Sequence, residues 1–241
     1  MAGVAREELL ACCIARLIGE AAHVAVGAAS PIPATACALL QAQGRSLRVS
    51  LLHRRRGNPF TEGSRELFDL AGQGRIDVFF LGGAQIDGAA NVNLVRAGEH
   101  RFPGSFGSAF MYFAARRTIL FREEHTRRVL VPRVDFISAP GSSPPELWRR
   151  GGPQALLTGK ALFAWQPELR RFRLMSVHPG HDVAGIREQT GFDYDAAETA
   201  PPTPAPSAGE LALLRGPVAH AVAANYPEFA RRVWGGDVAP A

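Results

Sequence analysis

The sequence predicts an α/β fold, in which an open, mostly parallel sheet is flanked by helices and continues into an antiparallel C-terminal extension. Apolar residues recur at helical spacing near the N-terminus, and short runs of strand-forming residues alternate with such helical segments. Beyond Gly141 this alternation gives way to a hairpin-like pair of strands. Strands that alternate with helices favour parallel pairing with right-handed crossovers.

In the first part of the chain, an amphipathic helix is expected over residues 5–19, followed by a strand at 23–26. Ser30 suits the N-cap and Pro31 the first position of a second helix, which should run to about Gly44. The next expected elements are a strand at 47–52, a helix capped by Ser64 over 64–72 and a strand at 76–81.

In the rest of the chain, the expected elements are a helix at 108–116, a strand at 118–121, a strand pair within 129–137, a hairpin of 161–165 with 172–177, and a helix at 183–190 capped by Asp182. Helical segments should also form over 209–216 and 217–234. These elements predict one α/β domain over residues 1–198, a proline-rich linker over 199–208 and a C-terminal helical segment over 209–241 that packs on the domain.

Composition argues for an ordinary cytoplasmic protein. The 241 residues are 46% hydrophobic, which is enough to bury a core. Lys160 is the single lysine among 27 basic residues, and the arginines are scattered over all predicted elements, so nucleic-acid binding is not expected. Three cysteines lie in apolar helical patterns and are expected to be reduced core residues. No basic-then-apolar leader and no run of about 18 apolar residues occurs, so neither secretion nor a membrane span is expected.

The most informative stretch begins where the strand-forming run Val78–Leu81 stops at Gly82 and Gly83. Glycines at the end of a buried strand let backbone N–H groups approach a ligand without side chains in the way. Ligands of open α/β sheets bind at this end of the strands. The alternative is a tight βα turn without a ligand.

Four stretches, in the right order, resemble the beta subunit of the family that includes glutaconate CoA-transferase. They are Leu81–Asp87 with Asn91 and Asn93, Arg101–Ala109, Asp135–Gly141, and Ser176–Gly180 with Thr190–Phe192. The resemblance implies an acyl-CoA substrate and an alpha-like subunit as obligate partner, with the active site between the two subunits. No metal is expected at the site.

One departure from the family concerns the mechanism. CoA-transferases of this family carry a nucleophilic glutamate just after the second strand, but here no carboxylate lies between Glu20 and Glu62. A covalent mechanism cannot run without its nucleophile. The scaffold also serves relatives without this glutamate, among them a CoA-dependent steroid-ring hydrolase and a methylglutaconyl-CoA decarboxylase. We therefore expect CoA-thioester hydrolysis or decarboxylation instead of glutamyl-CoA transfer, with the alternative that the chain is a non-catalytic acyl-CoA-binding or scaffolding subunit.

The expected catalytic residues are Gly83, Ala84 and His53. Backbone N–H groups of the glycine turn would stabilise the charge that develops on a thioester oxygen, and losing one such donor costs on the order of 3 kcal/mol in barrier height. The expected substrate- and CoA-binding residues are Gly82, Gln85, Asp87, Asn91, Asn93, Gly104, Gly107 and Arg54.

Several of these residues have a structural alternative. Asp87, Asn91 and Asn93 are expected mainly to hold the loop by hydrogen bonds to backbone amides. The alternative is that Asp87 carries a proton during catalysis. His53 stands close to the position at which the family carries its glutamate. It could act as a general base there, or it is a surface histidine. The arginines at 54–56 could grip CoA phosphates or be solvated.

Other site types find little support in the sequence. His178 and His181 flank Pro-Gly and lack the further cysteine or carboxylate ligands that a tetrahedral zinc site requires. The sequence also lacks the Gly-x-Ser-x-Gly elbow, the Walker A loop and the Gly-x-Gly-x-x-Gly fingerprint. Serine hydrolase, ATPase and nicotinamide chemistry are therefore not expected.

Overall fold

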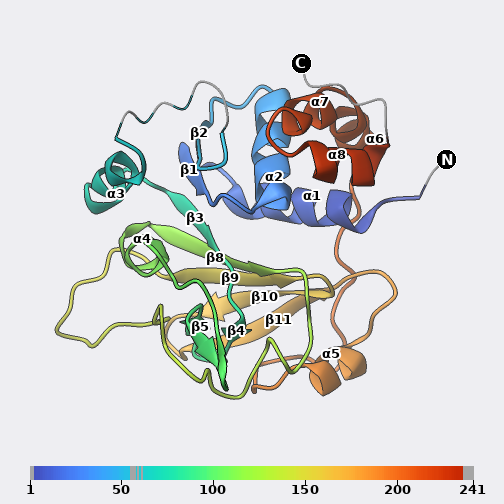
Figure 1. Cartoon of the computed structure of the whole chain (residues 1–241). Coiled ribbons are helices and arrows are strands. Elements are labelled where there is room, and N and C mark those ends of the chain that lie inside the picture. The colour runs from blue at the N-terminus through green and yellow to red at the C-terminus, as the bar shows by residue number, and fades with distance from the viewer. Residues whose placement is uncertain (1–2, 55–57, 59, 61, 236–241) are drawn as a thin grey trace. The chain divides into compact units, whose positions relative to one another are not determined.

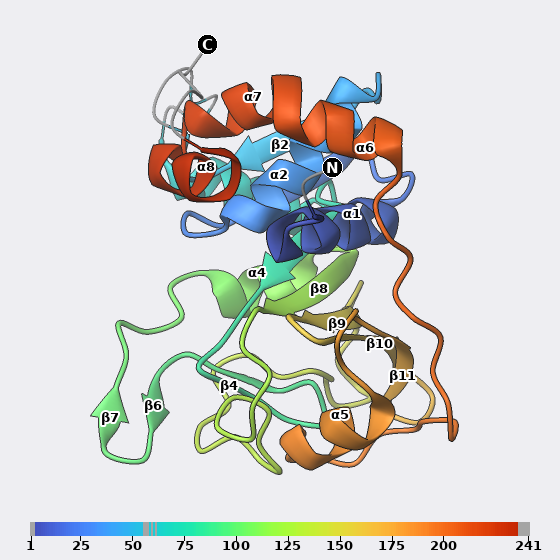
Figure 2. The same ribbon diagram turned by 90° about the vertical axis from the view of Figure 1, so that its right-hand side faces the viewer.

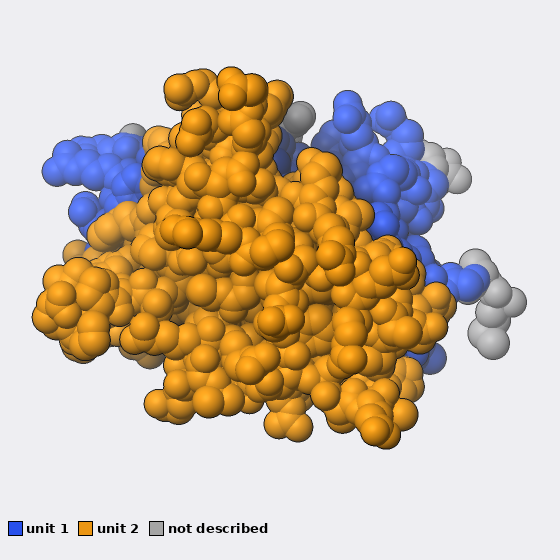
Figure 3. Space-filling view, turned by 90° about the horizontal axis from the view of Figure 1, so that it is seen from below, with its two compact units in different colours: residues 1–69, 76–78, 204–241 blue, residues 70–75, 79–203 orange. Residues whose placement is uncertain are grey.

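The computed structural model describes residues 3–54, 58, 60 and 62–235. The chain divides into two compact units, which Figure 3 colours separately. Unit 1 comprises Met1–Asp69, Ile76–Val78 and Pro204–Ala241, and unit 2 comprises Leu70–Arg75 and Phe79–Thr203. The domain boundaries expected from the sequence stay a prediction.

Unit 1 combines one pair of parallel strands with helices from both ends of the chain (Figure 1). Strand β1 (His23–Val26) pairs with β2 (Arg48–Leu51), with His23 opposite Arg48. The helices are α1 (Arg6–Ile18), α2 (Pro31–Ala42), α6 (Ala208–Leu213), a π-type turn η1 (Leu214–Val218), α7 (Ala219–Ala223) and α8 (Pro227–Trp234). The chain kinks within η1, where Pro217 follows Gly216 with its non-helical backbone.

An ion pair between a buried carboxylate and a partly exposed arginine joins the two ends of the chain in unit 1. Glu8 on α1 is 2% exposed, and its carboxylate accepts hydrogen bonds from Arg215 Nε at 2.7 Å and from the Ala5 N–H at 2.9 Å. A buried carboxylate is tolerated only when it is paired in this way. Helices α1 and α2 lie where the sequence predicted them, although the Ser30 side chain makes no capping hydrogen bond to α2. The helix expected over 217–234 is instead interrupted after Ala223, and α8 starts anew at Pro227.

Unit 2 is built on a mixed sheet, whose strands lie in the order β11-β10-β9-β8-β3. Strands β8 and β9 are parallel, whereas β9–β10 and β10–β11 are antiparallel. The strands are β3 (Val78–Leu81, from Phe79 onward in this unit), β8 (Arg117–Arg122), β9 (Pro153–Thr158), β10 (Ala161–Gln166) and β11 (Arg171–Val177). The expected α/β class, with its antiparallel C-terminal extension, is confirmed.

Shorter elements complete unit 2. Two hairpins, β4 (Gln85–Ile86) with β5 (Val92–Asn93) and β6 (Arg96–Ala97) with β7 (His100–Arg101), follow β3. Figure 2 shows the second hairpin projecting from the other strands of the unit. The helices are α4 (Ser108–Ala114) and α5 (Val183–Gln189), the latter capped by Asp182 Oδ1, which accepts from the Gly185 N–H at 2.7 Å. Helix α3 (Ser64–Gly72) begins in unit 1 and ends in unit 2.

Two expectations about this unit were wrong. Residues 129–137 form no strand, because Pro132 lacks an N–H to continue a ladder and only Leu130 makes an isolated bridge, to Ile86. Conversely, β9 was missed, since the Gly151-Gly152-Pro153 run indicated a loop, whereas the strand starts at Pro153 itself.

The proline-rich stretch after residue 198 is partly anchored within unit 2. The Val177 N–H donates to the Pro201 carbonyl at 3.1 Å, and the Thr203 N–H donates to the Val177 carbonyl at 2.8 Å. This stretch therefore runs beside the end of β11 as far as Thr203.

The three cysteines are free thiols buried in helices α1 and α2, as expected. Burial raises the pKa of the Cys12 and Cys37 thiols to about 12 and that of Cys13 to about 11, so all three are protonated at neutral pH. None of the helices in the described residues has the length and apolar character needed to cross a bilayer.

Candidate functional site

The turn after β3 needs glycine at both of its first positions. A Cβ on Gly82 would lie 2.7 Å from the Phe121 carbonyl oxygen, and one on Gly83 would lie 2.5 Å from Val92 Cγ1. Both contacts are too close for any other residue, so close packing alone explains the two glycines. A tight turn without a ligand, the alternative stated for this segment, is therefore sufficient to account for Gly82 and Gly83.

The N–H groups of this turn differ in their bonding. The Ala84 N–H donates to the Asn93 carbonyl at 2.9 Å, so it is engaged within the hairpin and is not open to a ligand. By contrast, the Gly82 and Gly83 N–H groups find no hydrogen-bond acceptor among the described residues, and Gly83 is buried. Buried backbone N–H groups are nearly always paired in native proteins. Gly83 therefore stands out as an N–H group that a ligand oxygen could satisfy.

Gln85 and Asn93 brace the hairpin from inside. Asn93 is fully buried, and its Nδ2 donates to Gln85 Oε1 at 2.7 Å. Its Oδ1 accepts from the Val95 and Arg96 N–H groups at 3.1 and 3.2 Å. Gln85 Oε1 also accepts from the Asp135 N–H at 3.0 Å. The Asn93 amide and the Gln85 oxygen are thus engaged in structural bonds, which favours the loop-holding interpretation of Asn93 over direct ligand contact.

The Asp87 carboxylate, directly after β4, accepts four hydrogen bonds. Its Oδ1 accepts from the Ala89 and Asn91 N–H groups at 3.1 and 3.0 Å, and its Oδ2 accepts from Asn91 Nδ2 at 3.1 Å and from the Val134 N–H at 3.3 Å. The side chain is only 3% exposed. Four donors satisfy this buried acceptor from within the protein, so the architectural role predicted for Asp87 accounts for its geometry.

Asn91 links the turn around Asp87 to the 138–141 segment, because its Oδ1 accepts from the Gly141 N–H at 3.1 Å. The preceding Ala90 has φ of 59°, in the left-handed region that alanine rarely adopts, and its carbonyl accepts from the Tyr112 hydroxyl at 3.0 Å. A Cβ on Gly141 would approach the Ala89 carbonyl to 2.1 Å. The turn is thus fixed by packing from α4 and from the 138–141 segment.

Three residues that hold the turn were not anticipated as site residues. They are Tyr112, whose pKa is raised by burial, Ser138, which accepts from the Leu94 N–H at 2.9 Å and donates to the Val92 carbonyl at 2.8 Å, and Gly141. Ser138 and Gly141 belong to the Asp135–Gly141 stretch that carried part of the resemblance. That stretch was the available signal for two of the three.

Gly104 and Gly107 lie in the segment that leads into α4. Gly104 has φ of 105° in open space, and Gly107 is the residue before the helix. No hydrogen bond among the described residues joins either of them to the Gly82–Gly83 turn. Their predicted contribution to acyl binding stays a prediction.

His53 and Arg54 lie in unit 1, whereas the glycine turn lies in unit 2. The His53 ring stacks on Tyr226, with centroids 4.7 Å apart and planes 11° from parallel, and the Arg54 N–H donates to the Leu51 carbonyl at 3.1 Å. The neighbouring Arg55 and Arg56 lie outside the described residues. Burial raises the pKa of Tyr226 to about 12, so the ring stacked on His53 is neutral.

His178 is part of a hydrogen-bonded core with His125. His178 Nε2 donates to the Thr158 carbonyl at 3.0 Å and its Nδ1 lies 2.7 Å from Thr203 Oγ1. His125 Nδ1 lies 2.8 Å from Thr158 Oγ1. Burial lowers the pKa of each imidazole to about 4, so both are neutral at pH 7. Across the residues described, no three His, Cys, Asp or Glu side chains converge as metal ligands.

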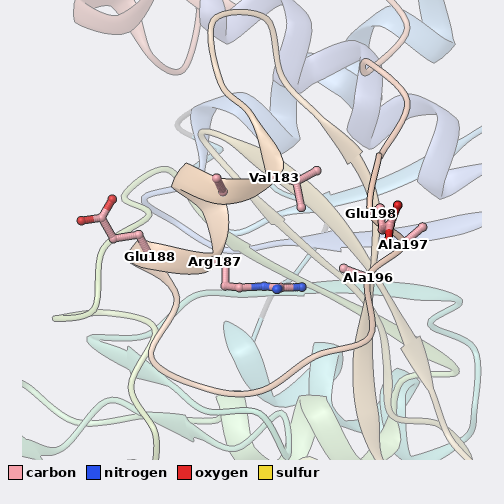
Figure 4. Close-up of a pocket in the computed structure, with 7 residues that line it drawn as sticks. Val183, Arg187, Glu188, Ala196, Ala197 and Glu198 are labelled. Atoms are coloured by element: carbon pink, nitrogen blue, oxygen red, sulfur yellow. The ribbon is translucent and has the colours of Figure 1, made fainter.

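A cavity of ≈ 600 Å³ lies beside α5, lined by Val183, Ala184, Arg187, Glu188 and residues 196–198. Figure 4 shows the Arg187 side chain extending toward Ala196, while Glu188 points away. None of the sequence-predicted site residues lines this cavity. It is therefore separate from the glycine turn.

Comparison with known proteins identifies two curated relatives. The chain is 30% identical over 163 residues to the B component of 3-oxoadipate CoA-transferase from Pseudomonas knackmussii, covering 63% of this chain and 62% of that protein. It is 31% identical over 143 residues to the B component of glutaconate CoA-transferase from Acidaminococcus fermentans, covering 53% of each. In both cases the match spans less than two thirds of the relative's length. No protein-family model matches the chain.

Solved structures share the fold. A variant of the decarboxylase AibA/AibB superposes with a TM-score of 0.71 and 26% identity, over 88% of this chain and 95% of that one. The crystal structure of the Acidaminococcus fermentans glutaconate CoA-transferase has a TM-score of 0.76, covering 89% and 94% of the two chains, but at 22% identity it supports the fold alone. The relatives of this chain are therefore CoA-transferase beta subunits, and it shares their type of fold.

Proposed function

We propose that this chain, as a relative of CoA-transferase beta subunits, is the beta-like component of a heteromeric enzyme that acts on an acyl-CoA thioester. The observation that carries the proposal is the buried Gly83 N–H, which has no acceptor among the described residues and sits in a turn fixed by Asp87 and Asn93. A preorganised N–H of this kind suits an oxygen that gains negative charge during a reaction.

The proposed chemistry is hydrolysis or decarboxylation. In hydrolysis, a water oxygen bonds to the thioester carbon, the carbon–sulfur bond breaks, and CoA leaves as the thiol after taking a proton. In decarboxylation, the bond to a substrate carboxylate breaks, its electron pair moves toward the thioester carbonyl, carbon dioxide leaves and carbon is protonated. Both routes place negative charge on the thioester oxygen, where one backbone donor lowers the barrier by about 3 kcal/mol.

The sequence supports a route without a covalent intermediate. No Asp or Glu lies between Glu20 and Glu62, so the chain offers no carboxylate nucleophile in the region after β2 up to that point. Similarity to the decarboxylase AibA/AibB at 26% identity supports a non-transfer activity on this fold. In this proposal His53, which follows β2 closely, is a candidate general base, and an alpha-like partner supplies any further carboxylate.

An alpha-like partner is supported by the names of the relatives and by the surface of unit 2. Both curated relatives are named as one component of a CoA-transferase with several subunits, and the similar decarboxylase is named as a pair, AibA/AibB. Unit 2 exposes several large apolar side chains, among them Phe106 at 81% and Trp148 at 73%. Exposed apolar surface of this kind typically marks protein contact sites.

The second candidate function is a non-catalytic subunit that binds acyl-CoA or supports a partner. Neighbouring atoms require glycine at positions 82 and 83 whether or not a ligand binds. The packing of this turn is therefore as compatible with a non-catalytic subunit as with an enzyme. Turnover by the assembled complex discriminates between the two.

The test is to co-express the chain with an alpha-like CoA-transferase subunit from the same genome and to follow a panel of acyl-CoA thioesters by mass spectrometry. We expect the copurified complex to release free CoA or to produce a thioester shortened by carbon dioxide. A complex that binds acyl-CoA without consuming any of them would support the non-catalytic alternative. Transfer of CoA to an added carboxylic acid as the main reaction would contradict the proposed route.

A further inference from the structure

A second cavity in unit 2, of ≈ 500 Å³, is lined by an unusual set of side chains. It lies between the start of β8, the segment leading into β9 and the turn from β10 to β11. Five of its lining residues are arginines and none is an Asp or Glu: Arg116, Arg117, Arg149, Arg150 and Arg170. We refer to the space that these five residues line as the arginine cavity.

Arg149 is fixed in the wall of the arginine cavity. Its Nη1 donates to the Pro140 carbonyl and its Nη2 to the Tyr112 carbonyl, both at 2.9 Å, and its guanidinium carbon lies 4.7 Å from the Tyr112 ring centroid. Its Nε is buried and has no hydrogen-bond partner among the described residues. A guanidinium held in place this way has already lost the freedom that binding would otherwise cost.

Arg150 and Arg170 add charge that the protein does not neutralise. The Arg150 guanidinium lies 5.4 Å from the Trp148 ring centroid, and neither residue makes an ion pair with any carboxylate in the described part of the chain. Other arginines of the protein, such as Arg215 with Glu8 and Arg232 with Glu7, do form ion pairs. Like charges gathered around one cavity repel each other, and a bound anion relieves that repulsion.

The shape and chemistry of the arginine cavity indicate which anion fits. Guanidinium groups match phosphate oxygens with paired N–H donors, and several arginines around one space suit more than one phosphate group. Trp165 also lines the cavity and offers an aromatic ring for stacking. A volume of ≈ 500 Å³ lies in the range of small-molecule sites.

The arginine cavity is distinct from the Gly82–Gly83 turn. Gly82 packs against the carbonyl of Phe121, near the end of β8, whereas Arg117 begins that strand. Four residues of strand separate the two places by about 13 Å. The cavity nevertheless reaches the far end of the glycine hairpin, since its lining residue Gly141 donates to Asn91.

We infer that the arginine cavity is a binding site for a nucleotide-type phosphate ester, recognised through Arg149, Arg150 and Arg170. This ligand chemistry has two sources, the nucleotide end of a CoA molecule or a separate nucleotide. The inference does not depend on the proposed acyl-CoA chemistry, because it rests on the charge and geometry of a different part of unit 2.

The test is calorimetric titration of the full chain, in complex with its partner where the two copurify, with inorganic pyrophosphate and with adenosine 3′,5′-bisphosphate at low salt. The double variant Arg150→Ala/Arg170→Ala should weaken binding of both probes by about tenfold or more. The matched control is Arg133→Ala/Arg173→Ala, which removes two exposed arginines of the same unit. We expect the control to change affinity less than about twofold, as screened surface charges do.

Thermal unfolding of all variants serves as the folding check. Equal weakening by the control pair, or no binding of either probe to the unmodified protein, would overturn the inference. Competition then identifies the source. If CoA displaces pyrophosphate, the ligand of the site is the nucleotide end of CoA. If only free nucleotides displace pyrophosphate, the ligand is a separate nucleotide.

Discussion

Asp87 illustrates how a single side chain organises the turn that follows β3. Its carboxylate accepts four N–H groups while only 3% exposed, and each of these donors belongs to the hairpin or to the 134 region. Removing one partner from a buried hydrogen-bonded group costs the desolvation of the atoms left unpaired. We therefore regard Asp87 as a positioning residue for the turn.

The variant Asp87→Asn tests this role at the residue scale. Its amide replaces an acceptor oxygen by an NH₂ group that faces donors, so we expect a loss of about 2–4 kcal/mol in the free energy of unfolding, measured by urea denaturation. The matched control Asp193→Asn changes an exposed carboxylate and should stay within about 0.5 kcal/mol. Equal stability of the two variants would remove Asp87 from this role.

His53 is the residue-scale test of catalysis. Its ring stacks on Tyr226 through one face, and this contact does not involve the imidazole nitrogens at the ring edge. In the assembled complex, His53→Gln should lower kcat by about 10²–10⁴-fold, the usual contribution of a general base, with little change in Tm. Tyr226→Phe keeps the stacked ring and serves as the control. Unchanged kcat in His53→Gln would show that this histidine only packs.

At the scale of elements, the β4–β5 hairpin and the 138–141 segment depend on close backbone approach. Gly141→Ala would place a Cβ 2.1 Å from the Ala89 carbonyl, so we expect it to cost about 3 kcal/mol or more of unfolding free energy. The control Gly209→Ala adds a Cβ with nothing within 4 Å inside α6, and it should stabilise the protein by about 0.5 kcal/mol. Guanidinium denaturation of both variants gives the comparison, and a neutral Gly141→Ala would contradict the packing described here.

Elements with strong local signals were predictable from the sequence, and those set by distant partners were not. Helix α1 and strand β1 follow from apolar periodicity and appear where the pattern placed them. Strand β9 begins at a proline after two glycines, and it forms because β8 and β10 provide pairing partners on both sides. Residues 129–137 had strand-like composition, but Pro132 interrupts them.

The same distinction holds for the candidate site. The glycine turn and its Asp87, Asn91 and Asn93 could be found because they are adjacent in sequence. Tyr112 lies 22 residues from its partner Ala90, and Ser138 lies 46 residues from Val92, so only the folded chain brings them to the turn. The arginine cavity draws on separated segments of the chain, which explains why the sequence showed only scattered arginines.

At the scale of the whole molecule, two buried histidines make stability depend on pH. Burial lowers the pKa of His125 and of His178 to about 4, and both are hydrogen-bonded as neutral rings. In the unfolded chain their pKa returns to about 6.5, so the unfolded state binds more protons between these values. The neutral pair therefore contributes stability that is present above pH 6.5 and is lost as the pH falls toward 4.

We expect the free energy of unfolding to fall by about 2 kcal/mol per histidine between pH 7 and pH 5, as measured by urea denaturation in matched buffers. This window lies above the range in which ordinary carboxylates titrate, so their contribution stays small. The variant His178→Asn, if folded, should show about half of the pH dependence. A flat stability profile over this window would contradict the buried neutral pair.

The proposed function is also a whole-molecule property, because it requires a partner and an acyl-CoA. The exposed apolar side chains of unit 2 and the unpaired Gly83 N–H are features that an isolated chain leaves unsatisfied. Both would be explained by an assembled complex with bound thioester. That explanation involves no covalent CoA thioester on this chain.

The most direct measurement is the intact mass of this chain during turnover of acyl-CoA by the assembled complex, quenched in acid before the steady state ends. The account predicts that acyl-CoA is consumed while the mass of the chain stays unchanged. A chain whose mass increases by one CoA would contradict it, since that adduct is the mark of the covalent transfer route.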